Sequence, residues 1–323
     1  MVTNVNAINR DKVDKWKRDI EKSVDFYNEW FLAFAPSTFR NARSTARKQV
    51  EDVFEATDDG RELTAATLVL APQTLPVLRQ MTCPPLARDR LAGLSGVSPS
   101  VVKRLESLDR PPSRSSGKLL AYAEKIVPVL KGTFDVDLMP WLDGKSSQPT
   151  PVQRSRAALV VADRLCGSLS DPIIRNAQEK RQLEAITAWL VGKGYAKTTP
   201  NDFSQMKPGE FAFHLNVNVK VAVGSESRVN IPVDVAIQPL SAEQGDVPIF
   251  FEAKSAGDFA NVNKRRKEEA QKISQLKLTY GDNVRFLLFL CGYFDSGYLG
   301  YEAAEGIDWI WEHRISDMEH LGL

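Results

Sequence analysis

Apolar and polar residues alternate with two different periods along this chain. In roughly the first 140 residues, apolar positions recur every three or four residues, which is the spacing of an amphipathic helix. The clearest run comprises Val13, Trp16, Ile20, Val24 and Tyr27. A Pro-Ser-Thr stretch then predicts an interruption, and a second helix is expected from Arg40 to Phe54. The first part of the chain is therefore expected to be mainly helical.

Two short helices joined by a glycine-containing turn are expected between Leu91 and Leu105. Ser98 is the expected N-cap of the second helix, with Pro99 at its first position. Two loop-like stretches follow, Ser107 to Gly117 and Asp143 to Gln153. Both are rich in residues that break regular structure. We place the domain boundary in the second stretch, which gives a helical region at 1–150 and a second domain at 151–323.

The second half has a different pattern, because strand-like apolar runs follow its first helices. Helices are expected around Ala157–Leu165 and Arg175–Val191. The expected strands and the elements after them are Glu210–Val223, Arg228–Ile237, Pro248–Lys254, a helix at Val262–Leu278, a buried strand at Val284–Cys291 and a closing helix at Glu302–Ile315. This order predicts an α/β domain with a central mixed sheet flanked by helices.

Acidic residues interrupt two neighbouring strand-like runs. Asp234 lies within the apolar run Ile231–Ile237, while Glu252 and Lys254 lie at the end of Ile249–Lys254. Side chains alternate along a strand, so Glu252 and Lys254 project from the same face. A carboxylate within an apolar strand is costly unless it is paired or bound to a metal. The bland alternative is a strand-end aspartate beside a solvated Glu–Lys pair.

Two carboxylates and an ammonium group are suited to phosphodiester hydrolysis. Asp234 and Glu252 are the candidate ligands of Mg²⁺, with the backbone carbonyl of Ala253 as a third ligand. Lys254 is the candidate group that positions or deprotonates the attacking water and offsets negative charge. The spacing resembles the PD-(D/E)xK nuclease signature, read as Pro232-Val-Asp234 and Glu252-Ala-Lys254, with one residue more than the bare motif between Pro and Asp. This resemblance implies a restriction-endonuclease-like core.

A further carboxylate is expected from the helix before the sheet. Glu179 lies four residues before Leu183, which belongs to the buried stripe of that helix. Glu179 is therefore a candidate for an outer or water-mediated metal contact. The alternative is an acid favoured near a helix start by the helix dipole.

Two basic segments are candidates for DNA contact. The first follows the Glu252–Lys254 motif and contains side chains of the kinds that bind phosphates or read purine edges. Its candidates are Ser255, Asp258, Asn261, Asn263, Lys264, Arg265, Arg266 and Lys267. The second is the two-helix segment near Leu91–Leu105, read as similar to a helix-turn-helix. Its candidates are Arg88, Arg90, Lys103 and Arg104. The alternatives are a solvated charged helix for the first segment and ordinary helix packing for the second.

Composition limits the function classes. The 323 residues are 43% hydrophobic and 26% charged, which is typical of a globular protein. Three scattered cysteines predict neither a disulfide framework nor a zinc site, and a reducing cytoplasm is the expected location. There is no apolar run long enough for a membrane span and no secretory signal pattern. The net charge of +1 means that DNA binding has to rest on local clusters.

Longer segments resemble the XamI-type family of Type II restriction endonucleases. They are Asp171–Gln182, Val229–Gln238, Phe251–Phe259, Gly297–Arg314 and, in the first half, Cys83–Gly93. The resemblance implies a Mg²⁺-dependent enzyme that cuts both strands of a short palindromic DNA site, leaving a 5′-phosphate and a 3′-hydroxyl. It also implies a homodimer, a GTCGAC-like target, a companion methyltransferase that protects the DNA of a bacterial or archaeal host, and no membrane partner.

Two other functions remain open from the residues alone. The first is a repair or mobile-element nuclease with the same core. The second is a non-catalytic DNA-binding protein that kept the fold. The presence of Asp234, Glu252 and Lys254 together disfavours the second, because a degenerate site is expected to lose at least one of them.

Overall fold

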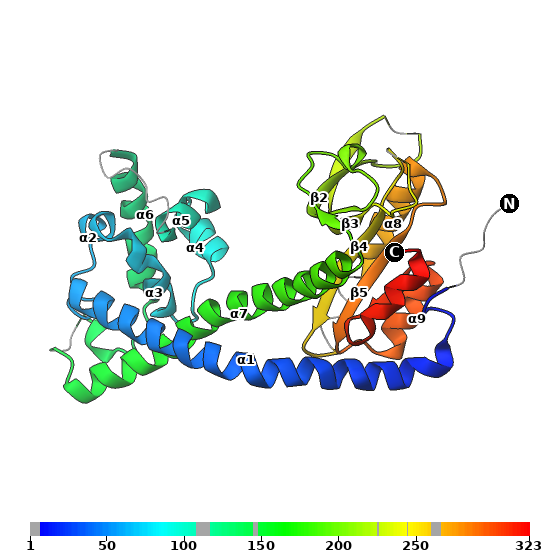
Figure 1. Ribbon diagram of the computed structural model, residues 1–323. Helices are drawn as coiled ribbons and strands as arrows, with labels where there is room; N and C mark the ends of the chain where they lie inside the picture. Colours follow the sequence, from blue (N-terminus) through cyan, green and yellow to red (C-terminus); the bar gives the residue numbers. More distant parts are fainter. Residues whose placement is uncertain (1–6, 108–116, 145–147, 225, 244, 260–265) are drawn as a thin grey trace. The chain divides into compact units, whose positions relative to one another are not determined.

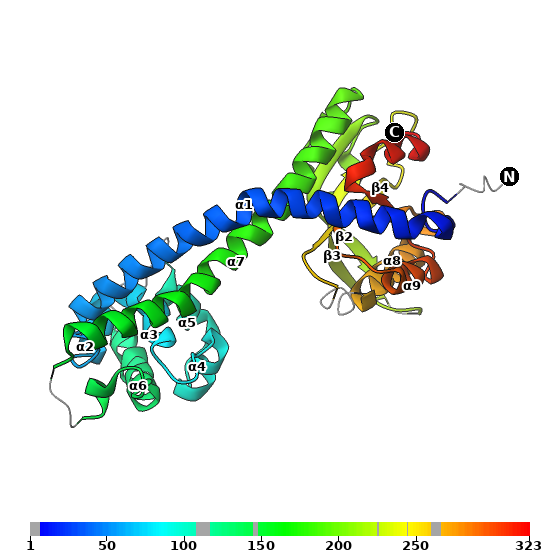
Figure 2. The same ribbon diagram turned by 90° about the horizontal axis from the view of Figure 1, so that it is seen from below.

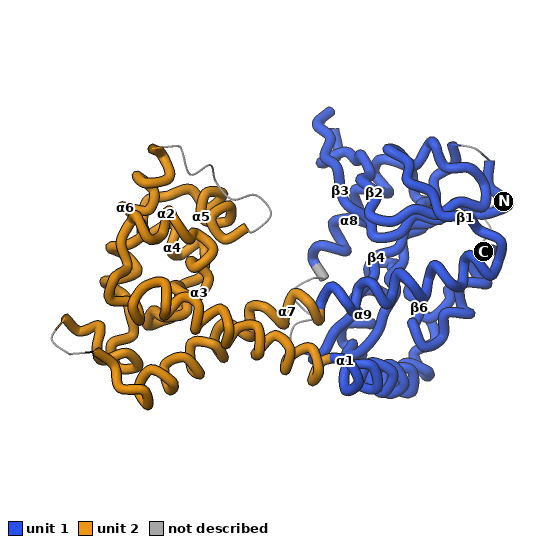
Figure 3. The backbone as a smooth tube through the Cα atoms, turned by 60° about the vertical axis from the view of Figure 1, so that its left-hand side comes forward, with its two compact units in different colours: residues 1–34, 175–323 blue, residues 35–174 orange. Residues whose placement is uncertain are grey.

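The computed structural model describes residues 7–107, 117–144, 148–224, 226–243, 245–259 and 266–323. The chain forms two compact units (Figure 3). Unit 1 comprises residues 1–34 and 175–323, and unit 2 comprises residues 35–174. The mixed α/β class is confirmed.

Unit 1 is built on a six-stranded mixed sheet in the order β1-β2-β3-β4-β5-β6 (Figure 1). Strand β3 is antiparallel to both of its neighbours, β2 and β4, while β1 runs parallel to β2 and the last three strands, β4, β5 and β6, run parallel to one another. The strands are β1 (Ala196–Lys197), β2 (Glu210–Lys220), β3 (Arg228–Ile237), β4 (Ile249–Ala256), β5 (Phe286–Gly292) and β6 (Asp308–Trp311). All residues of β5 are buried, as expected for a central strand.

Helices cover both faces of this sheet. On one face, α8 (Arg266–Tyr280) and α9 (Ser296–Ala304) pack with the start of α1 (Val13–Ala56) against side chains such as Val233, Leu288 and Trp309. On the other face, Ile186 and Leu190 of α7 (Pro151–Gly192) pack against side chains such as Val235, Phe251 and Phe289. The sheet is therefore buried between two helical layers, which positions the ends of β3 and β4 between them.

The sequence did not predict how unit 1 closes. The expected helix from Glu302 to Ile315 is wrong, because α9 ends at Ala304 and β6 then runs from Asp308 to Trp311. The Trp-Ile-Trp sequence of β6 is buried against β5. Aromatic and β-branched residues favour a strand once a neighbouring strand is available. The chain ends in the 3₁₀ segment η5 (Glu312–Leu321), and another such segment, η3 (Phe203–Gln205), precedes β2.

Two helices are longer than the sequence predicts, and both can be followed in Figure 2. Each of them continues through a proline. Helix α1 (Val13–Ala56) contains Pro36, where an interruption was expected, and α7 (Pro151–Gly192) contains Pro172. An internal proline removes one helical hydrogen bond and costs about 3 kcal/mol. Ala35, Ala42 and Ala46 of α1 are buried on the two sides of Pro36. Tertiary packing thus outweighs the local signal for a helix end.

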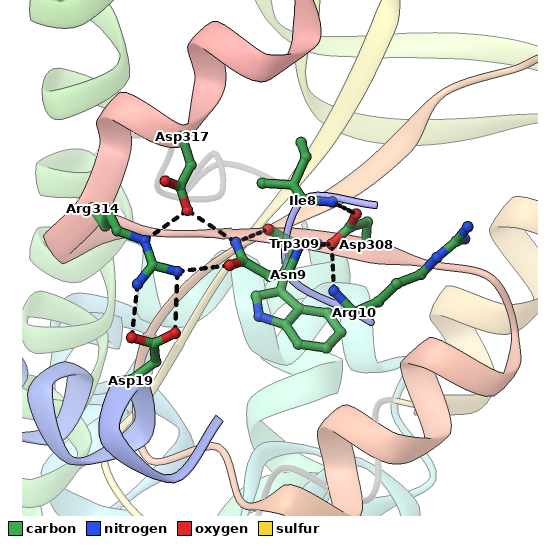
Figure 4. Close-up of polar contacts among 8 residues, drawn as sticks. All are labelled: Ile8, Asn9, Arg10, Asp19, Asp308, Trp309, Arg314 and Asp317. Atoms are coloured by element: carbon green, nitrogen blue, oxygen red, sulfur yellow. Dashed lines mark hydrogen bonds and ion pairs between the residues drawn. The ribbon is translucent and has the colours of Figure 1, made fainter. Parts of the chain in front are cut away.

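The units have different limits from the expected boundary near Asp143–Gln153, because the first 34 residues belong to unit 1. A polar network ties them to β6 and to the C-terminal segment (Figure 4). The carboxylate of Asp308 accepts hydrogen bonds from the backbone N–H groups of Ile8, Asn9 and Arg10 at 2.5–3.0 Å. These contacts join residues about 300 positions apart, so sequence patterns do not reveal them.

Unit 2 is helical, and its elements surround one hydrophobic core that includes Phe54, Leu78 and Leu130. The turn between α4 (Arg88–Ser95) and α5 (Pro99–Glu106) matches the expected two-helix segment: Gly96 ends α4 in the left-handed region at φ 63°, and Pro99 begins α5. Ser98 occupies the N-cap position, but its hydroxyl contacts that of Ser100 instead of capping the helix. The other elements are α2 (Ala65–Leu70), η1 (Pro72–Thr74), α3 (Leu75–Gln80), α4 (Arg88–Ser95), α5 (Pro99–Glu106), α6 (Gly117–Thr133) and η2 (Pro140–Leu142).

Within the ranges given above, none of the helices combines the length and the apolar character that a membrane crossing requires.

Candidate active site

The candidate site lies where β3 and β4 separate. The two strands pair from Ile237↔Ile249 to Val235↔Phe251, and by this register Asp234 and Glu252 are the next opposite residues. Beyond this point the backbone pairing stops, and a side chain provides the next hydrogen bond between the strands: Asp234 Oδ2 accepts from the backbone N–H of Ala253 at 2.8 Å. Asp234 and Glu252 are therefore opposite each other, just beyond the last backbone-paired residues of the two strands.

The sheet is irregular at the position of Asp234. Val233 packs on one face of the sheet and Val235 on the other, although residues two apart in a regular strand share a face. The residue opposite Asp234 on β2, by the register of its neighbours, is His214, whose φ is +53°. A left-handed backbone at a non-glycine residue is uncommon and costs on the order of 1 kcal/mol. Both strands thus depart from regular geometry at Asp234 and His214, which changes the directions of these two side chains.

Four charged side chains of alternating sign form a chain of ion pairs beside Asp234. Lys254 Nζ lies 3.1 Å from Glu252 Oε1 and 2.8 Å from Glu269 Oε1. Lys272 Nζ lies 2.7 Å from Glu252 Oε2. Glu252 and Glu269 are both buried, so their pairing with ammonium groups offsets the cost of their burial.

Burial and neighbouring charges shift the pKa values of Asp234 and Lys254. Burial and, after it, the charge of Glu252 raise the pKa of Asp234 above its ordinary value, although the hydrogen bond from Ala253 opposes the shift. Burial alone would lower the pKa of Lys254, but the carboxylates of Glu252 and Glu269 outweigh it and raise that pKa. Lys254 is therefore held in its charged form.

The donor set fits a hard divalent cation. Asp234, Glu252 and the carbonyl of Ala253 supply oxygen, which is the ligand type that Mg²⁺ prefers. The repulsion from Glu252 that helps to raise the pKa of Asp234 is one that a cation between the two carboxylates would relieve. No group of three or more His, Cys, Asp or Glu side chains suited to a metal occurs in the described ranges. Two carboxylates plus backbone oxygen and water meet the usual needs of Mg²⁺.

Glu179 lies next to His214 and not in the chain of ion pairs beside Asp234. Its Oε1 is 3.7 Å from His214 Nε2, and both side chains are about half exposed. They line a groove of about 520 Å³ together with Asn176, Lys180, Leu183, Glu184, Thr187, Lys197 and Phe213. Since His214 is opposite Asp234, the groove begins one strand away from the candidate site.

Sequence reasoning missed three residues that surround the motif. Glu269 and Lys272 lie on α8, and Gln182 of α7 donates from Nε2 to the backbone carbonyls of Lys254 and Phe289, both at 3.2 Å. A signal for the α8 pair exists, because Glu269 and Lys272 precede the buried Ile273 and Leu276 at helical spacing. A charged residue on the buried stripe of a helix indicates a partner in the interior.

The predicted DNA-contacting loop is only partly described. Ser255 lies in β4, and its buried hydroxyl has no hydrogen-bond partner among the described residues. Asp258 and Lys267 are exposed, and Arg266 begins α8. Asn261, Asn263, Lys264 and Arg265 fall outside the described residues.

The second set of predicted DNA contacts lies on α4 and α5 of unit 2. Arg90, Lys103 and Arg104 are exposed. Arg88 differs from them, because its Nε lies 2.6 Å from Glu106 Oε2, and Glu106 also pairs with the buried Arg79. Arg88 therefore helps to join α4 to α5, whereas the other three side chains are accessible to a ligand.

Comparison with known proteins identifies the class. Residues 58–311 match the model of the XamI restriction endonuclease family. The Type II restriction enzyme SalI of Streptomyces albus G is 49% identical over 319 residues, which are 98% of this chain and 99% of that enzyme. Protein VC1899 from Vibrio cholerae has a TM-score of 0.28 at 14% identity, covering 79% of this chain and 55% of that one, and we draw nothing from so low a score.

These similarities extend over both units and define a restriction endonuclease. The chain belongs to the XamI restriction endonuclease family and is a Type II restriction enzyme, a site-specific deoxyribonuclease. The family resemblance predicted from the sequence is confirmed. The repair or mobile-element nuclease and the non-catalytic DNA-binding protein are thereby set aside.

Proposed function

We propose that this enzyme hydrolyses both strands of duplex DNA at a short palindromic, GTCGAC-like site in a Mg²⁺-dependent reaction. The observation that carries the proposal is the pair of carboxylates, Asp234 and Glu252, beside Lys254 where β3 and β4 separate. The target sequence is proposed because the 49% identity to SalI extends over nearly the whole chain, including unit 2. The products are a 5′-phosphate and a 3′-hydroxyl.

The side chains have distinct roles in this proposal. Asp234, Glu252 and the carbonyl of Ala253 would hold Mg²⁺, which when bound polarises the phosphate and lowers the pKa of its water. Lys254 orients the attacking water and stabilises charge on the phosphate oxygens. Glu179 is proposed as an outer, water-mediated contact reached through the His214 groove.

Cutting both strands of a palindrome is a symmetric task, so we propose that two copies act together as a homodimer. A restriction enzyme also endangers the DNA of its own host. The proposal therefore includes a companion methyltransferase that modifies the same site, as a functional partner without physical contact. We also propose that the enzyme acts in the cytoplasm of a bacterial or archaeal cell, where its DNA substrate lies.

The decisive experiment uses unmethylated plasmid DNA. Incubation with Mg²⁺ is expected to give discrete fragments whose sequenced ends share one palindromic site, while EDTA is expected to leave the plasmid intact. A reaction without enzyme is the control. A smear of fragments would contradict site-specific cleavage, and equal cutting in EDTA would contradict the proposed metal dependence.

The helices α4 and α5 are proposed to contact DNA through the accessible side chains Arg90, Lys103 and Arg104. Replacing Arg90 and Arg104 together by alanine is expected to weaken DNA binding by roughly 10- to 100-fold, as lost base or phosphate contacts usually do. The dissociation constant is measured by fluorescence anisotropy with Ca²⁺ in place of Mg²⁺. A double variant of Lys118 and Lys125, exposed on α6 of the same unit, removes equal charge as the control. Equal affinities for the two double variants would remove α4 and α5 from the DNA interface.

A further inference from the structure

Helix α8 contributes two charged side chains to the candidate site, one turn apart. Glu269 is 1% exposed and lies against Lys254, while Lys272 lies against Glu252. Each of these contacts joins α8 to β4, and neither residue belongs to the motif on the strands. Helix α8 thus does more than cover the sheet, since it determines the electrostatic surroundings of Glu252.

The two lysines differ in what they would keep after leaving Glu252. Lys254 has a second carboxylate at 2.8 Å, that of Glu269, and would remain in an ion pair. Lys272 also donates a hydrogen bond to the neutral backbone carbonyl of Pro232 at 2.9 Å. If Lys254 separates from Glu252, it still has an ion pair with Glu269. If Lys272 separates from Glu252, it keeps only the hydrogen bond to the neutral carbonyl of Pro232 among these contacts.

Both oxygens of Glu252 are engaged by ammonium groups. Oε2 is 2.7 Å from Lys272 and Oε1 is 3.1 Å from Lys254. A divalent cation that binds this carboxylate meets positive charge at short range and competes with it. Lys272 makes the shorter contact with Glu252 and is not part of the strand motif. A metal that binds Glu252 therefore competes mainly with Lys272.

We propose that Lys272 is a positioning residue. Its ammonium group pairs with the carboxylate of Glu252 when no metal is bound, and a divalent metal that binds Glu252 displaces it. This inference rests on the proposed function, because it assumes that Glu252 is a metal ligand. Lys272 neutralises and orients a buried carboxylate that would otherwise be left under-compensated. The same contact lowers the affinity of the site for metal. Removing the charge of Lys272 should therefore strengthen metal binding, an effect opposite to that of general damage to the site.

The test measures Ca²⁺ binding in the absence of DNA, by isothermal titration calorimetry on the full-length protein. Lys272→Gln is expected to bind Ca²⁺ about tenfold more tightly than the unsubstituted enzyme, because one of two neighbouring positive charges is gone. A tenfold change corresponds to about 1.4 kcal/mol. Lys272→Arg keeps the charge and is expected to behave like the unsubstituted enzyme.

Two controls separate this effect from general electrostatics. Lys277→Gln removes the same charge from α8 outside the ion-pair chain and is expected to leave Ca²⁺ affinity unchanged. Glu252→Gln is expected to abolish Ca²⁺ binding both in the otherwise unsubstituted enzyme and in the Lys272→Gln variant. The Ca²⁺-induced rise in melting temperature gives a second readout, which is expected to be larger for Lys272→Gln and for the uncharged Lys272→Met than for the unsubstituted enzyme.

The outcomes distinguish this inference from the proposed function. Equal or weaker Ca²⁺ binding by folded Lys272→Gln or Lys272→Met, with binding still dependent on Glu252, overturns the exchange and leaves the metal site in place. Ca²⁺ binding that is unaffected by Glu252→Gln overturns both. Tighter binding by both uncharged variants, together with unchanged binding by Lys272→Arg and Lys277→Gln, supports the exchange.

Discussion

Replacing Glu252 by glutamine or Lys254 by alanine is expected to slow DNA cleavage on the order of a thousandfold or more while DNA binding persists. Glutamine keeps the size of Glu252 but removes the charge that pairs with Lys254 and Lys272. Alanine removes the ammonium group proposed to orient water at the phosphate. The measurement is the single-turnover cleavage rate of a duplex that contains the target site. DNA affinity is measured separately in Ca²⁺.

The matched control for these variants is Glu268→Gln. Glu268 is an exposed neighbour of Glu269 in the first turn of α8, so it carries the same charge on the same element without reaching the site. We expect its cleavage rate to stay within about twofold of the unsubstituted enzyme, as is usual for surface changes. Normal cleavage by the Glu252 or Lys254 variant would remove that residue from the mechanism.

Replacing Arg314 by alanine is expected to lower the free energy of unfolding of the protein by about 3 kcal/mol. Arg314 binds both carboxylate oxygens of Asp19 at 2.7 and 3.1 Å, and the carboxylate of Asp317 at 2.7 Å (Figure 4). The side chain of Asp19 is only 2% exposed. Without Arg314 this carboxylate stays buried with its charge uncompensated, which is the costly way to break an ion pair.

The measurement for Arg314→Ala is urea unfolding followed by tryptophan fluorescence, because Trp16 and Trp309 lie in the same unit. Arg18→Ala, an exposed neighbour of Asp19 on α1, is the matched control and is expected to change stability by less than about 0.5 kcal/mol. A loss of stability no larger for Arg314→Ala than for Arg18→Ala would show that the N-terminal segment is not held in unit 1 by this network.

Local sequence patterns predicted most strands of unit 1 well. The expected strand Arg228–Ile237 coincides with β3, and the apolar run Val284–Cys291 overlaps the buried β5. These elements have strong periodicity over their own length, which is the signal that survives without knowledge of neighbours. The closing segment was misassigned because the tryptophans of β6 depend on pairing with β5. The break expected near Pro36 was wrong for a related reason, since packing along α1 overrides the local penalty, and α7 likewise continues through Pro172.

The candidate site divides in the same way. Asp234, Glu252 and Lys254 were selected because charged residues within apolar strands are conspicuous in a sequence. Glu269 and Lys272 lie among other charged residues on α8, so their spacing to the buried stripe is a weaker signal, and their contacts with Lys254 and Glu252 show what they do. The roles of all five remain proposals, and the variants above test those of Glu252, Lys254 and Lys272.

The sequence by itself determined the class of the fold, the order of the main strands and the family, because each of these depends on residues close together in the chain or on long matching segments. The tertiary structure alone decided that residues 1–34 join unit 1 and that α8 surrounds Glu252 with a second lysine and a second carboxylate. Hydrogen bonds such as that from Ile8 to Asp308 connect residues 300 positions apart. A contact of that kind leaves no periodic trace in either segment, so it becomes visible only when the chain is folded.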